Sequence, residues 1–430
     1  MPSAAVILAG ARTPFVKAWG AFRRIPAREL GRMAASEALA RSTVDPAEID
    51  EVIFGNIAQP ADATNIARVV ALRSNIPRSV PAYTVNRNCA SGIQAVVDAS
   101  LRIESGQADL ILAGGVESMS QIPLLYLPET QDLFLKAMRA RSFSQRVGAF
   151  LKLRPRHFKP VVALEVGLTD PVAGLNMGET AEVLAKRYQV TRDEQDSWAL
   201  ESHRRVAKAT ASGRFREEIA PVFLPPRYEE SVGDDIGYRA EQTLEALAKL
   251  KPVFDRRYGT VTAGNSSQIT DGAAALVLAS EERARSEGYP ILGRVRSWAF
   301  AGCDPAAMGM GPAYATPLAL RRGGAEFRDV KLIEINEAFA AQVIACERAF
   351  ASREFAQKEV GWSHPIGEMD RAVTNVNGGA IALGHPVGCT GARLVLTLCL
   401  EMNRRGKDLG LATLCVGGGQ GAAILIEKAS

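Results

Sequence analysis

The stretch from Thr84 to Gly92 combines a nucleophilic side chain with a backbone pattern that would expose it. Residues 84–88 read as a strand running into a polar turn, and the apolar spacing after Gly92 predicts a helix. Cys89 would then lie at or just before a helix N-terminus, where unpaired N–H groups and the helix dipole favour a thiolate over a thiol. The alternative for any isolated cysteine is a buried, inert thiol. The choice between them depends on residues far downstream.

The second candidate is His385, within the glycine-rich loop 384–393. Pro386 restricts this loop, and its glycines allow close approach of the backbone. An imidazole changes charge near neutral pH and therefore suits proton transfer. The chain has four histidines. The other three lie in charged or irregular surroundings and are interpreted as surface or structural residues: His157, His203 and His364.

Two more polar signals follow strand-like segments. Cys415 opens the glycine-rich stretch 415–421, but the residues after it look like a last strand, whereas a Rossmann phosphate loop needs a helix there. A glycine turn with free N–H donors fits better. Asn336 comes directly after a predicted strand and could hold a water or a carbonyl oxygen. Each signal alone is weak, but two cysteines, an asparagine and a histidine in such settings are hard to assign to packing.

Composition bounds the class of protein. With 430 residues, 47% apolar and 23% charged, the chain suggests two or three domains with a large core. A net charge of +4 is too small to argue for nucleic acid. Six cysteines without a Cys-x-x-Cys pair indicate neither a zinc ribbon nor a disulfide scaffold, and we expect no metal site. Without a signal-like start or an apolar run near the roughly 18 residues that span a bilayer, the expected location is cytoplasmic.

Strand-like and helix-like segments alternate through the first 118 residues. Strands are expected at 6–9, 52–54 and 110–113, the last ending at Gly114-Gly115, and helices at 27–40 and from Gly92 to Gly106. This alternation implies a parallel or mixed sheet covered on both faces. Ligands of such sheets bind beyond the carboxyl ends of the strands. Asn56, Cys89 and Gly114 all lie at such ends.

The C-terminal part repeats this order. It has a helix around 317–322, a strand at 332–335, an approach segment at 373–377, a helix from about 393 to 404 and a strand at 411–414. The repeat pairs Asn56 with Asn336, Cys89 with the His385 loop, and Gly114 with Gly417. We predict a duplicated domain whose halves bring Cys89 and His385 to a shared cleft. The alternative is the chance similarity that any alternating α/β chain shows.

Between the halves lies a more irregular and more charged insert, 119–252. Helices are predicted at 178–188 and 192–211, the second opened by a capping box from Thr191 to Glu194. Residues 134–160, here called the basic segment, carry eight Lys or Arg and no acid, interleaved with apolar side chains. Such a segment is typical of a face toward a membrane, a partner subunit or a phosphate-bearing ligand, and a solvated face is the alternative.

Along nearly its whole length the chain resembles the thiolases, that is, acetyl-CoA C-acyltransferases. The blocks that carry this resemblance are 86–92, 259–275, 336–340, 384–393 and 415–421. It implies an α/β thiolase fold of two duplicated βαβαβαββ halves in a five-layer α/β/α/β/α sandwich, with an inserted loop domain that binds CoA. The corresponding domains are 1–118 with 253–285, then 119–252, then 286–430.

The resemblance also implies roles. Cys89 would be the nucleophile that forms an acyl-thioester intermediate, and His385 would take its proton and later activate the incoming CoA thiol. Cys415 would move a proton to or from the acetyl α-carbon. One oxyanion would be held by the His385 ring and a water on Asn336, the other by the N–H groups of Cys89 and Gly417.

CoA is implied as a substrate, with no permanently bound cofactor. By similarity the CoA site would be lined by Ser267, Arg239, Met177, Ala338 and Phe339. Arg239 suits a phosphate or the adenine face. The implied reaction is thiolysis of a 3-oxoacyl-CoA or the reverse Claisen condensation, with a homodimer or tetramer as the expected assembly.

Two departures bear on the substrate and the partners. Asn176 stands before Met177 where many short-chain biosynthetic thiolases have histidine. The basic segment resembles the β-subunit of the trifunctional fatty-acid-oxidation complex, which would add a hydratase/dehydrogenase α-subunit or a peripheral membrane contact, although Asn336 follows ordinary thiolases. Medium or long 3-oxoacyl-CoA is favoured over short-chain acetoacetyl-CoA.

Two other functions are considered for this sequence. A ketoacyl synthase shares the fold but normally uses two histidines, which the Cys415 motif argues against. A non-catalytic acyl-CoA-binding subunit would need the acid and base groups to be lost, and they are all present.

Overall fold

The computed structural model describes residues 4–429, which form two compact units. The larger unit comprises the described residues up to Gln121 and those from Asp170 onward. The smaller unit is Ile122–Thr169. Every residue to which the sequence assigns chemistry lies in the larger unit, so the geometry of these residues is that of one compact body.

A ten-stranded sheet is the framework of the larger unit. Its strands follow the order β12-β13-β14-β11-β1-β10-β5-β3-β4, and β2 pairs with β10. The bounds are β1 Ala5–Arg12, β2 Val16–Lys17, β3 Glu51–Gly55, β4 Ala82–Val85, β5 Leu110–Ser118, β10 Thr270–Ser280, β11 Gly293–Gly302, β12 Leu332–Ile335, β13 Leu409–Val416 and β14 Gln420–Glu427. Parallel and antiparallel pairs both occur, which confirms the predicted mixed sheet.

The two halves of this sheet have the same topology. In the N-terminal half β3 is parallel to β5, β5 antiparallel to β10, and β10 antiparallel to β1. In the C-terminal half β12, β13, β14 and β11 repeat the scheme, and a bridge between Ile333 and Thr374 stands where β3 pairs with β4. The halves join where Val6 and Ile7 of β1 pair with β11. The strand pairing thus confirms the duplication.

Strand register fixes which residues are equivalent. The last residue of β3 pairs with Gly115 of β5, and the last residue of β12 pairs with Thr413 of β13. The residues that follow β3 and β12 are Asn56 and Asn336. The predicted pairing of these two asparagines is therefore correct.

The same register makes Glu117 the equivalent of Cys415, because each lies two residues beyond the partner of a strand end. Each is also paired with a glycine of the following strand, Gly272 for Glu117 and Gly421 for Cys415. The local sequence does not indicate this equivalence, because Glu117 and Cys415 have chemically different side chains.

The predicted pairing of Gly114 with Gly417 is wrong, as is the predicted end of the strand at Gly114-Gly115. Strand β5 continues to Ser118, whereas Gly417 lies in the turn between β13 and β14. The two glycines are inside the strand because neighbours approach closely. A Cβ on Gly115 would lie 2.0 Å from the carbonyl oxygen of Gly388.

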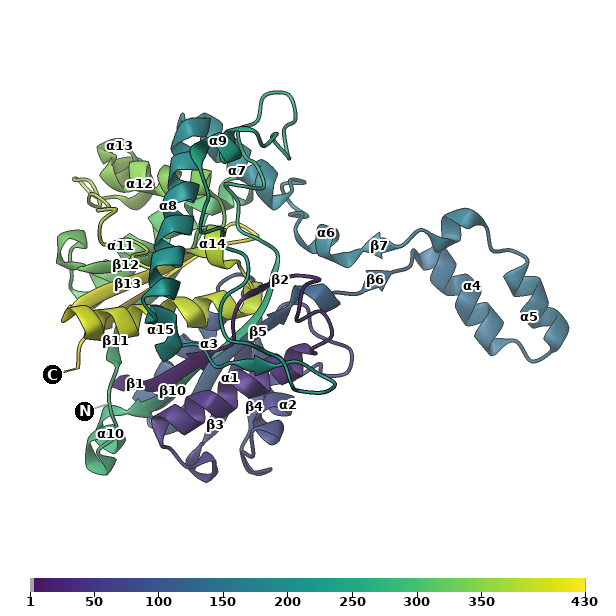
Figure 1. The fold of residues 1–430 in the computed structure, drawn as a ribbon, viewed down its shortest axis with the longest axis horizontal. Coiled ribbons are helices and arrows are strands. Elements are labelled where there is room, and N and C mark those ends of the chain that lie inside the picture. The colour runs from purple at the N-terminus through teal and green to yellow at the C-terminus, as the bar shows by residue number, and fades with distance from the viewer. Residues whose placement is uncertain (1–3, 430) are drawn as a thin grey trace. The chain divides into compact units, whose positions relative to one another are not determined.

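Helices cover the sheet in three layers (Figure 1). Helices α1 (Ala27–Ser42) and α2 (Ile66–Arg73) pack with β1, β3 and β5 in one buried cluster. Helices α3 (Ser91–Glu104) and α15 (Val387–Arg405) share a second cluster with strands of both halves. Helices α11 (Gly311–Gly323) and α12 (Ala340–Ala351) form a third with β12, β13 and β14. Three helix layers, each with an apolar core shared with strands of the sheet, agree with the expected α/β/α/β/α sandwich.

Helix boundaries follow the sequence in most places. The helix α8 spans Arg192–Ala211 with the predicted capping box, and α7 spans Met177–Arg187. The helix expected from about Arg393 begins six residues earlier, at Val387. Its first turns contain Gly388 and Gly391, which read as loop residues in the sequence but are helical because another backbone packs against them. The remaining helices of the larger unit include α9 Leu244–Ala248, α10 Glu281–Glu287, α13 Arg353–Phe355 and α14 Ala380–Leu383.

The smaller unit holds the whole basic segment. Its elements are β6 Leu124–Leu125, α4 Pro128–Arg139, α5 Phe143–Phe150, β7 Val161–Val162 and α6 Ala163–Gly167, with β6 and β7 paired. Residues 170–252, by contrast, belong to the larger unit. Among residues 4–429, no helix has the length and apolarity to cross a membrane.

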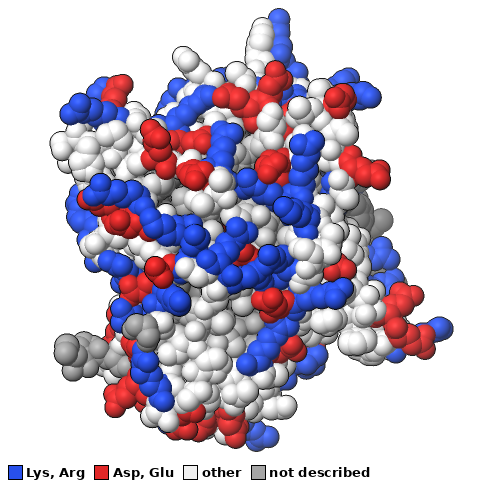
Figure 2. All heavy atoms as spheres, turned by 60° about the vertical axis from the view of Figure 1, so that its left-hand side comes forward, with Lys and Arg blue, Asp and Glu red and all other residues white. Residues whose placement is uncertain are grey.

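Charges of both signs are interspersed on the face drawn in Figure 2. Lys and Arg alternate there with Asp and Glu. Elsewhere in the chain, ion pairs such as Arg283 with Glu48 join residues far apart in the sequence. No field of a single sign covers this face, in keeping with the small net charge.

Candidate active site

A tight turn presents Cys89 at the start of α3. Strand β4 ends at Val85, and α3 begins at Ser91, two residues after the thiol. Asn88 has φ = 42°, in the left-handed region, and its side-chain amide donates to the carbonyl of Gly417 at 2.8 Å. The turn before the thiol is therefore fixed to the hairpin turn between β13 and β14.

Burial raises the pKa of the Cys89 thiol above its ordinary value. The amide N–H groups of Gly417 and of Cys89 itself face the sulfur and act in the opposite direction, and the nearby Glu117 adds to the rise. The predicted preference for a thiolate is therefore wrong for the resting protein, because desolvation outweighs the N–H donors. Cys89 is held as a thiol and needs a base to ionise it.

The surroundings of His385 favour a neutral imidazole. Its Nδ1 lies 2.6 Å from the Thr390 hydroxyl, and that hydroxyl donates to the carbonyl of Pro386 at 3.0 Å. Because a hydroxyl has a single proton, Nδ1 must be the donor to Thr390, which leaves Nε2 with a lone pair. Nε2 is buried and has no partner among the described residues. Burial, with a smaller effect from Arg393, lowers the pKa of His385 to about 4.

Cys89 and His385 each precede a helix, and these two helices pack against each other. His385 lies two residues before α15, as Cys89 lies two residues before α3. The first turns of these helices pack backbone to backbone: a Cβ on Gly92 would lie 2.4 Å from the amide nitrogen of Ala392, and one on Gly391 would lie 2.4 Å from that of Ile93. Glycine is required at both places, and the crossing brings the segments before the two helices to one end of the pair.

Cys415 and Asn336 come from neighbouring strands of the C-terminal half. Cys415 is the penultimate residue of β13 and is buried, and its pKa is raised well above that of an ordinary thiol by burial and then by the nearby Cys89. Asn336 follows β12 and is fully buried, and both polar atoms of its amide lack a partner among the described residues. A buried amide of this kind fits a bound water or a substrate oxygen.

Four of the predicted CoA-site residues lie around the same turns. The amide of Ser267 donates to the carbonyl of Ala338 at 2.9 Å, and Phe339 packs edge-on against Phe254. Met177 opens α7, and its sulfur would lie 3.4 Å from a Cβ on Gly417.

Arg239 is linked to these four residues indirectly, through the backbone before it. The carbonyl of Gly237, two residues before it, accepts from Gln268, the neighbour of Ser267. The backbone N–H of Arg239 donates to His203 Nδ1 at 3.2 Å. Its assignment to CoA, like those of the other four residues, stays a prediction.

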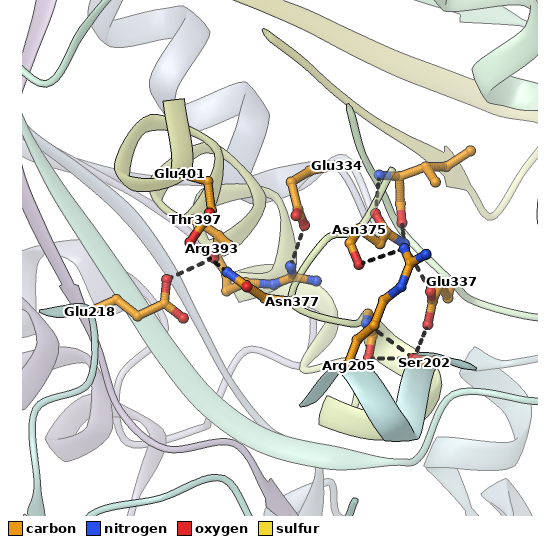
Figure 3. Close-up of polar contacts among 12 residues, drawn as sticks. Ser202, Arg205, Glu218, Glu334, Glu337, Asn375, Asn377, Arg393, Thr397 and Glu401 are labelled. Atoms are coloured by element: carbon orange, nitrogen blue, oxygen red, sulfur yellow. Dashed lines mark hydrogen bonds and ion pairs between the residues drawn. The ribbon is translucent and has the colours of Figure 1, made fainter. Parts of the chain in front are cut away.

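Sequence reasoning missed the buried acids around this site. Glu337 accepts hydrogen bonds from Trp198, Ser202, Asn375 and the amide of Ile381. Figure 3 shows this cluster beside a second one, in which Arg393 and Glu334 form a buried ion pair at 2.9 Å. An acid inside the apolar strand 332–335 is the signal that could have revealed a buried partner.

The other missed residues make hydrogen bonds beside Cys89 or His385. Thr390 fixes the tautomer of His385, and Asn88 ties the Cys89 turn to Gly417. Glu117 accepts a hydrogen bond in the first turn of α15 at 3.0 Å. Among the residues described, no group of three or more His, Cys, Asp or Glu is arranged to hold a metal ion.

Known proteins match the chain over its whole length. Residues 5–282 match the family model of the thiolase N-terminal domain, and residues 289–428 match that of the thiolase C-terminal domain. A 3-ketoacyl-CoA thiolase of Yersinia pestis (strain Pestoides F) is 43% identical over 98% of this chain and 96% of its own length.

Solved structures agree. The Bacillus anthracis acetyl-CoA acetyltransferase has a TM-score of 0.86 and 40% identity, covering 99% of this chain and 98% of its own. Human mitochondrial 3-ketoacyl-CoA thiolase in complex with CoA has a TM-score of 0.86 and 37% identity, covering 100% and 98%.

Proposed function

The chain belongs to the thiolase family of acyltransferases, and we propose that it cleaves 3-oxoacyl-CoA with CoA into acetyl-CoA and a shortened acyl-CoA, or runs the reverse Claisen condensation. The observation that supports this best is a half-buried Cys89 thiol before α3, together with an imidazole before the packed helix α15 whose Nε2 has no partner among the described residues. A thiol that cannot ionise alone, next to a base that stays neutral, is what nucleophilic catalysis at neutral pH requires.

In the first half-reaction Nε2 of His385 takes the Cys89 proton, and the sulfur attacks the 3-oxo carbon. The oxygen of that carbon becomes anionic, and the N–H groups of Cys89 and Gly417 that face the sulfur are placed to stabilise it. The bond between C2 and C3 then breaks. The electrons of this bond go to C2, which takes a proton from Cys415. Acetyl-CoA then leaves, and the shortened acyl group stays bound to Cys89.

The proton that His385 took from Cys89 passes to the Cys415 thiolate, which restores the neutral imidazole and the Cys415 thiol. In the second half-reaction His385 takes the proton of the incoming CoA thiol. The resulting CoA thiolate attacks the acyl group on Cys89, and the Cys89 sulfur leaves and takes the proton back from His385. The orphaned amide of Asn336 supports a water that, with the protonated imidazole, stabilises the enolate oxygen of the acetyl group. No permanently bound cofactor takes part in these steps, and CoA enters as a substrate.

Chain-length preference is the first prediction that follows. We expect the highest kcat/KM for thiolysis with medium or long 3-oxoacyl-CoA, because the residue before Met177 is Asn176, where many short-chain thiolases have histidine. The measurement is the thiolysis rate over a series of acyl lengths from four to sixteen carbons. A maximum at acetoacetyl-CoA would favour the short-chain biosynthetic alternative.

The small unit leads to a second prediction, that the basic segment binds a membrane or an α-subunit. Its exposed apolar residues are Leu135, Met138, Phe143, Val147, Phe150, Leu151 and Phe158. Met138 and Phe143 are 77% and 82% exposed, and cationic side chains lie between them, as in segments that enter anionic lipid headgroups.

We expect flotation with vesicles of 30% anionic lipid, and loss of flotation when Phe143 and Leu151 are replaced by serine. The control is Phe223→Ser, which also removes an exposed apolar ring, but in the larger unit. A pull-down with a candidate hydratase/dehydrogenase subunit tests the other partner. If both experiments are negative, the segment is a solvated or CoA-side face.

A homodimer or tetramer is part of the same proposal. Strand β4 is the last strand of the sheet and its residues are partly exposed, so its free edge can pair with a second copy. We further propose a cytoplasmic enzyme that acts in fatty-acid β-oxidation.

A further inference from the structure

Glu117 is a fully buried acid at the end of β5 that joins three segments. One carboxylate oxygen accepts from the side-chain amide of Asn56 at 2.9 Å and from the backbone of Ala58 at 3.1 Å. The other accepts from Ile57 at 3.1 Å and from Gly388 at 3.0 Å. The first three donors follow β3, but Gly388 is in the first turn of α15, three residues after His385. Glu117 is therefore a direct tie between the N-terminal half and the segment that carries the base.

The duplication allows the residues around Glu117 to be compared with their equivalents in the C-terminal half. In the C-terminal half the equivalents of Asn56 and Glu117 are Asn336 and Cys415, which face the loop of Cys89. In the N-terminal half Asn56 and Glu117 face the loop of the equivalent residue, His385. The molecule therefore contains two related constellations. The constellation of the C-terminal half has the unpartnered amide of Asn336 and the thiol of Cys415. In the constellation of the N-terminal half, the Glu117 carboxylate accepts four hydrogen bonds and holds the loop of His385 in place.

We propose that Glu117 and Asn56 are positioning residues for His385: their hydrogen bonds fix the start of α15, and with it the direction of His385 Nε2 toward Cys89. The proposal rests on the proposed function only in taking His385 as the base for Cys89.

The contacts around Gly388 support a positioning role over general packing. Its carbonyl oxygen would lie 2.0 Å from a Cβ on Gly115 and 2.7 Å from one on Gly55, so α15 begins directly on the ends of β3 and β5. Its N–H is one of the donors at a helix N-terminus that no intrahelical acceptor can satisfy, and a carboxylate there is favoured by the helix dipole. Glu117 is the acceptor that the described residues provide for this amide.

The carboxylate is also electrostatically close to the nucleophile. Its charge contributes to the raised pKa of Cys89, and burial raises the pKa of Glu117 itself to about 7, with Asp271 as the other nearby acid. Loss of this charge alone would lower the pKa of Cys89 and speed alkylation, so slower alkylation in a Glu117 variant reports a misaligned His385 and not the missing charge.

The test is Glu117→Gln, read out by the rate at which iodoacetamide alkylates Cys89 and by steady-state thiolysis. An amide cannot accept at both atoms, so one N–H donor faces an NH₂ group and the start of α15 shifts. We expect kcat to fall about 10- to 100-fold with KM for CoA changed less than about threefold, because orientation is lost while binding is kept. Glu117→Asp should recover part of kcat.

A double-mutant cycle identifies the route of the effect. In a His385→Asn background, Glu117→Gln should no longer slow alkylation, since the base that it positions is gone and only the acceleration from the lost charge is left. An equal slowing in both backgrounds would overturn the proposal, and so would an unchanged kcat in Glu117→Gln. Because alkylation needs no substrate, this result stands even if the chain proved not to be a thiolase.

The matched control is Glu182→Gln. Glu182 is another buried acid that accepts backbone N–H groups, here from Thr260 and Val261, and it makes no hydrogen bond to α15. A similar loss of thermal stability in both variants, with slowed alkylation only in Glu117→Gln, would support the proposal. If Glu182→Gln slows alkylation as much, the effect is general and the proposal fails.

Discussion

Cys89→Ala is expected to lower the rate of thiolysis by about 10⁴-fold or more, because no other side chain can carry the acyl group between the two half-reactions. CoA should still bind, since the residues assigned to its site come from other segments. The measurements are the steady-state rate and the dissociation constant of CoA by calorimetry. In the wild type, mass spectrometry after incubation with acyl-CoA should find the acyl group on Cys89.

Cys399→Ala is the control for this experiment. Cys399 is a fully buried thiol in the middle of α15, so its loss affects packing without removing a reacting group. Normal turnover in Cys89→Ala, or an acyl group found on Cys415 instead, would show that the nucleophile is assigned wrongly.

The second large effect is expected for His385→Asn. Without the imidazole, the Cys89 thiol keeps its raised pKa and has no acceptor for its proton. We expect kcat to fall by about 10²- to 10⁴-fold and alkylation of Cys89 to increase steeply with pH up to and above pH 9. Thr390→Ser, which keeps the hydroxyl that holds Nδ1, serves as the control and should retain most activity.

The protonation of His385 can be followed directly in the wild type. With its pKa lowered to about 4, the ring stays neutral from pH 5 to 8, whereas a histidine with the ordinary value near 6.5 would be mostly protonated at pH 5. The chain has four histidines, so the NMR signal that disappears in His385→Asn identifies the ring. A midpoint near 6.5 for that signal would contradict the buried, neutral base.

The sequence allowed prediction of those site residues whose signal is local. Cys89 and His385 stand in glycine-flanked segments before helices, and Asn336 follows a short apolar strand, so residue type and neighbours were enough. Glu117 could not be found in this way, because its partner Gly388 is distant in the sequence and the contact forms only when α15 packs on the ends of β3 and β5.

Two errors have the same physical origin. The expected thiolate at Cys89 and the expected strand end at Gly114-Gly115 both follow local rules, namely the helix dipole and the tendency of glycine to end a strand. Tertiary contacts reversed both. Burial of the sulfur outweighed the N–H donors, and the close approach of α15 requires small residues in the middle of β5.

The position of β14 has a consequence for how the molecule is made. This strand is the last element of the chain, yet it lies inside the sheet between β13 and β11. A nascent chain that still lacks these few residues has two open strand edges and a gap where the C-terminal half should close. The hairpin turn that faces the Cys89 sulfur also forms only then. The reaction centre therefore exists only once β14 has been synthesised and paired, and a deletion of β14 would remove a central strand and one wall of the site together.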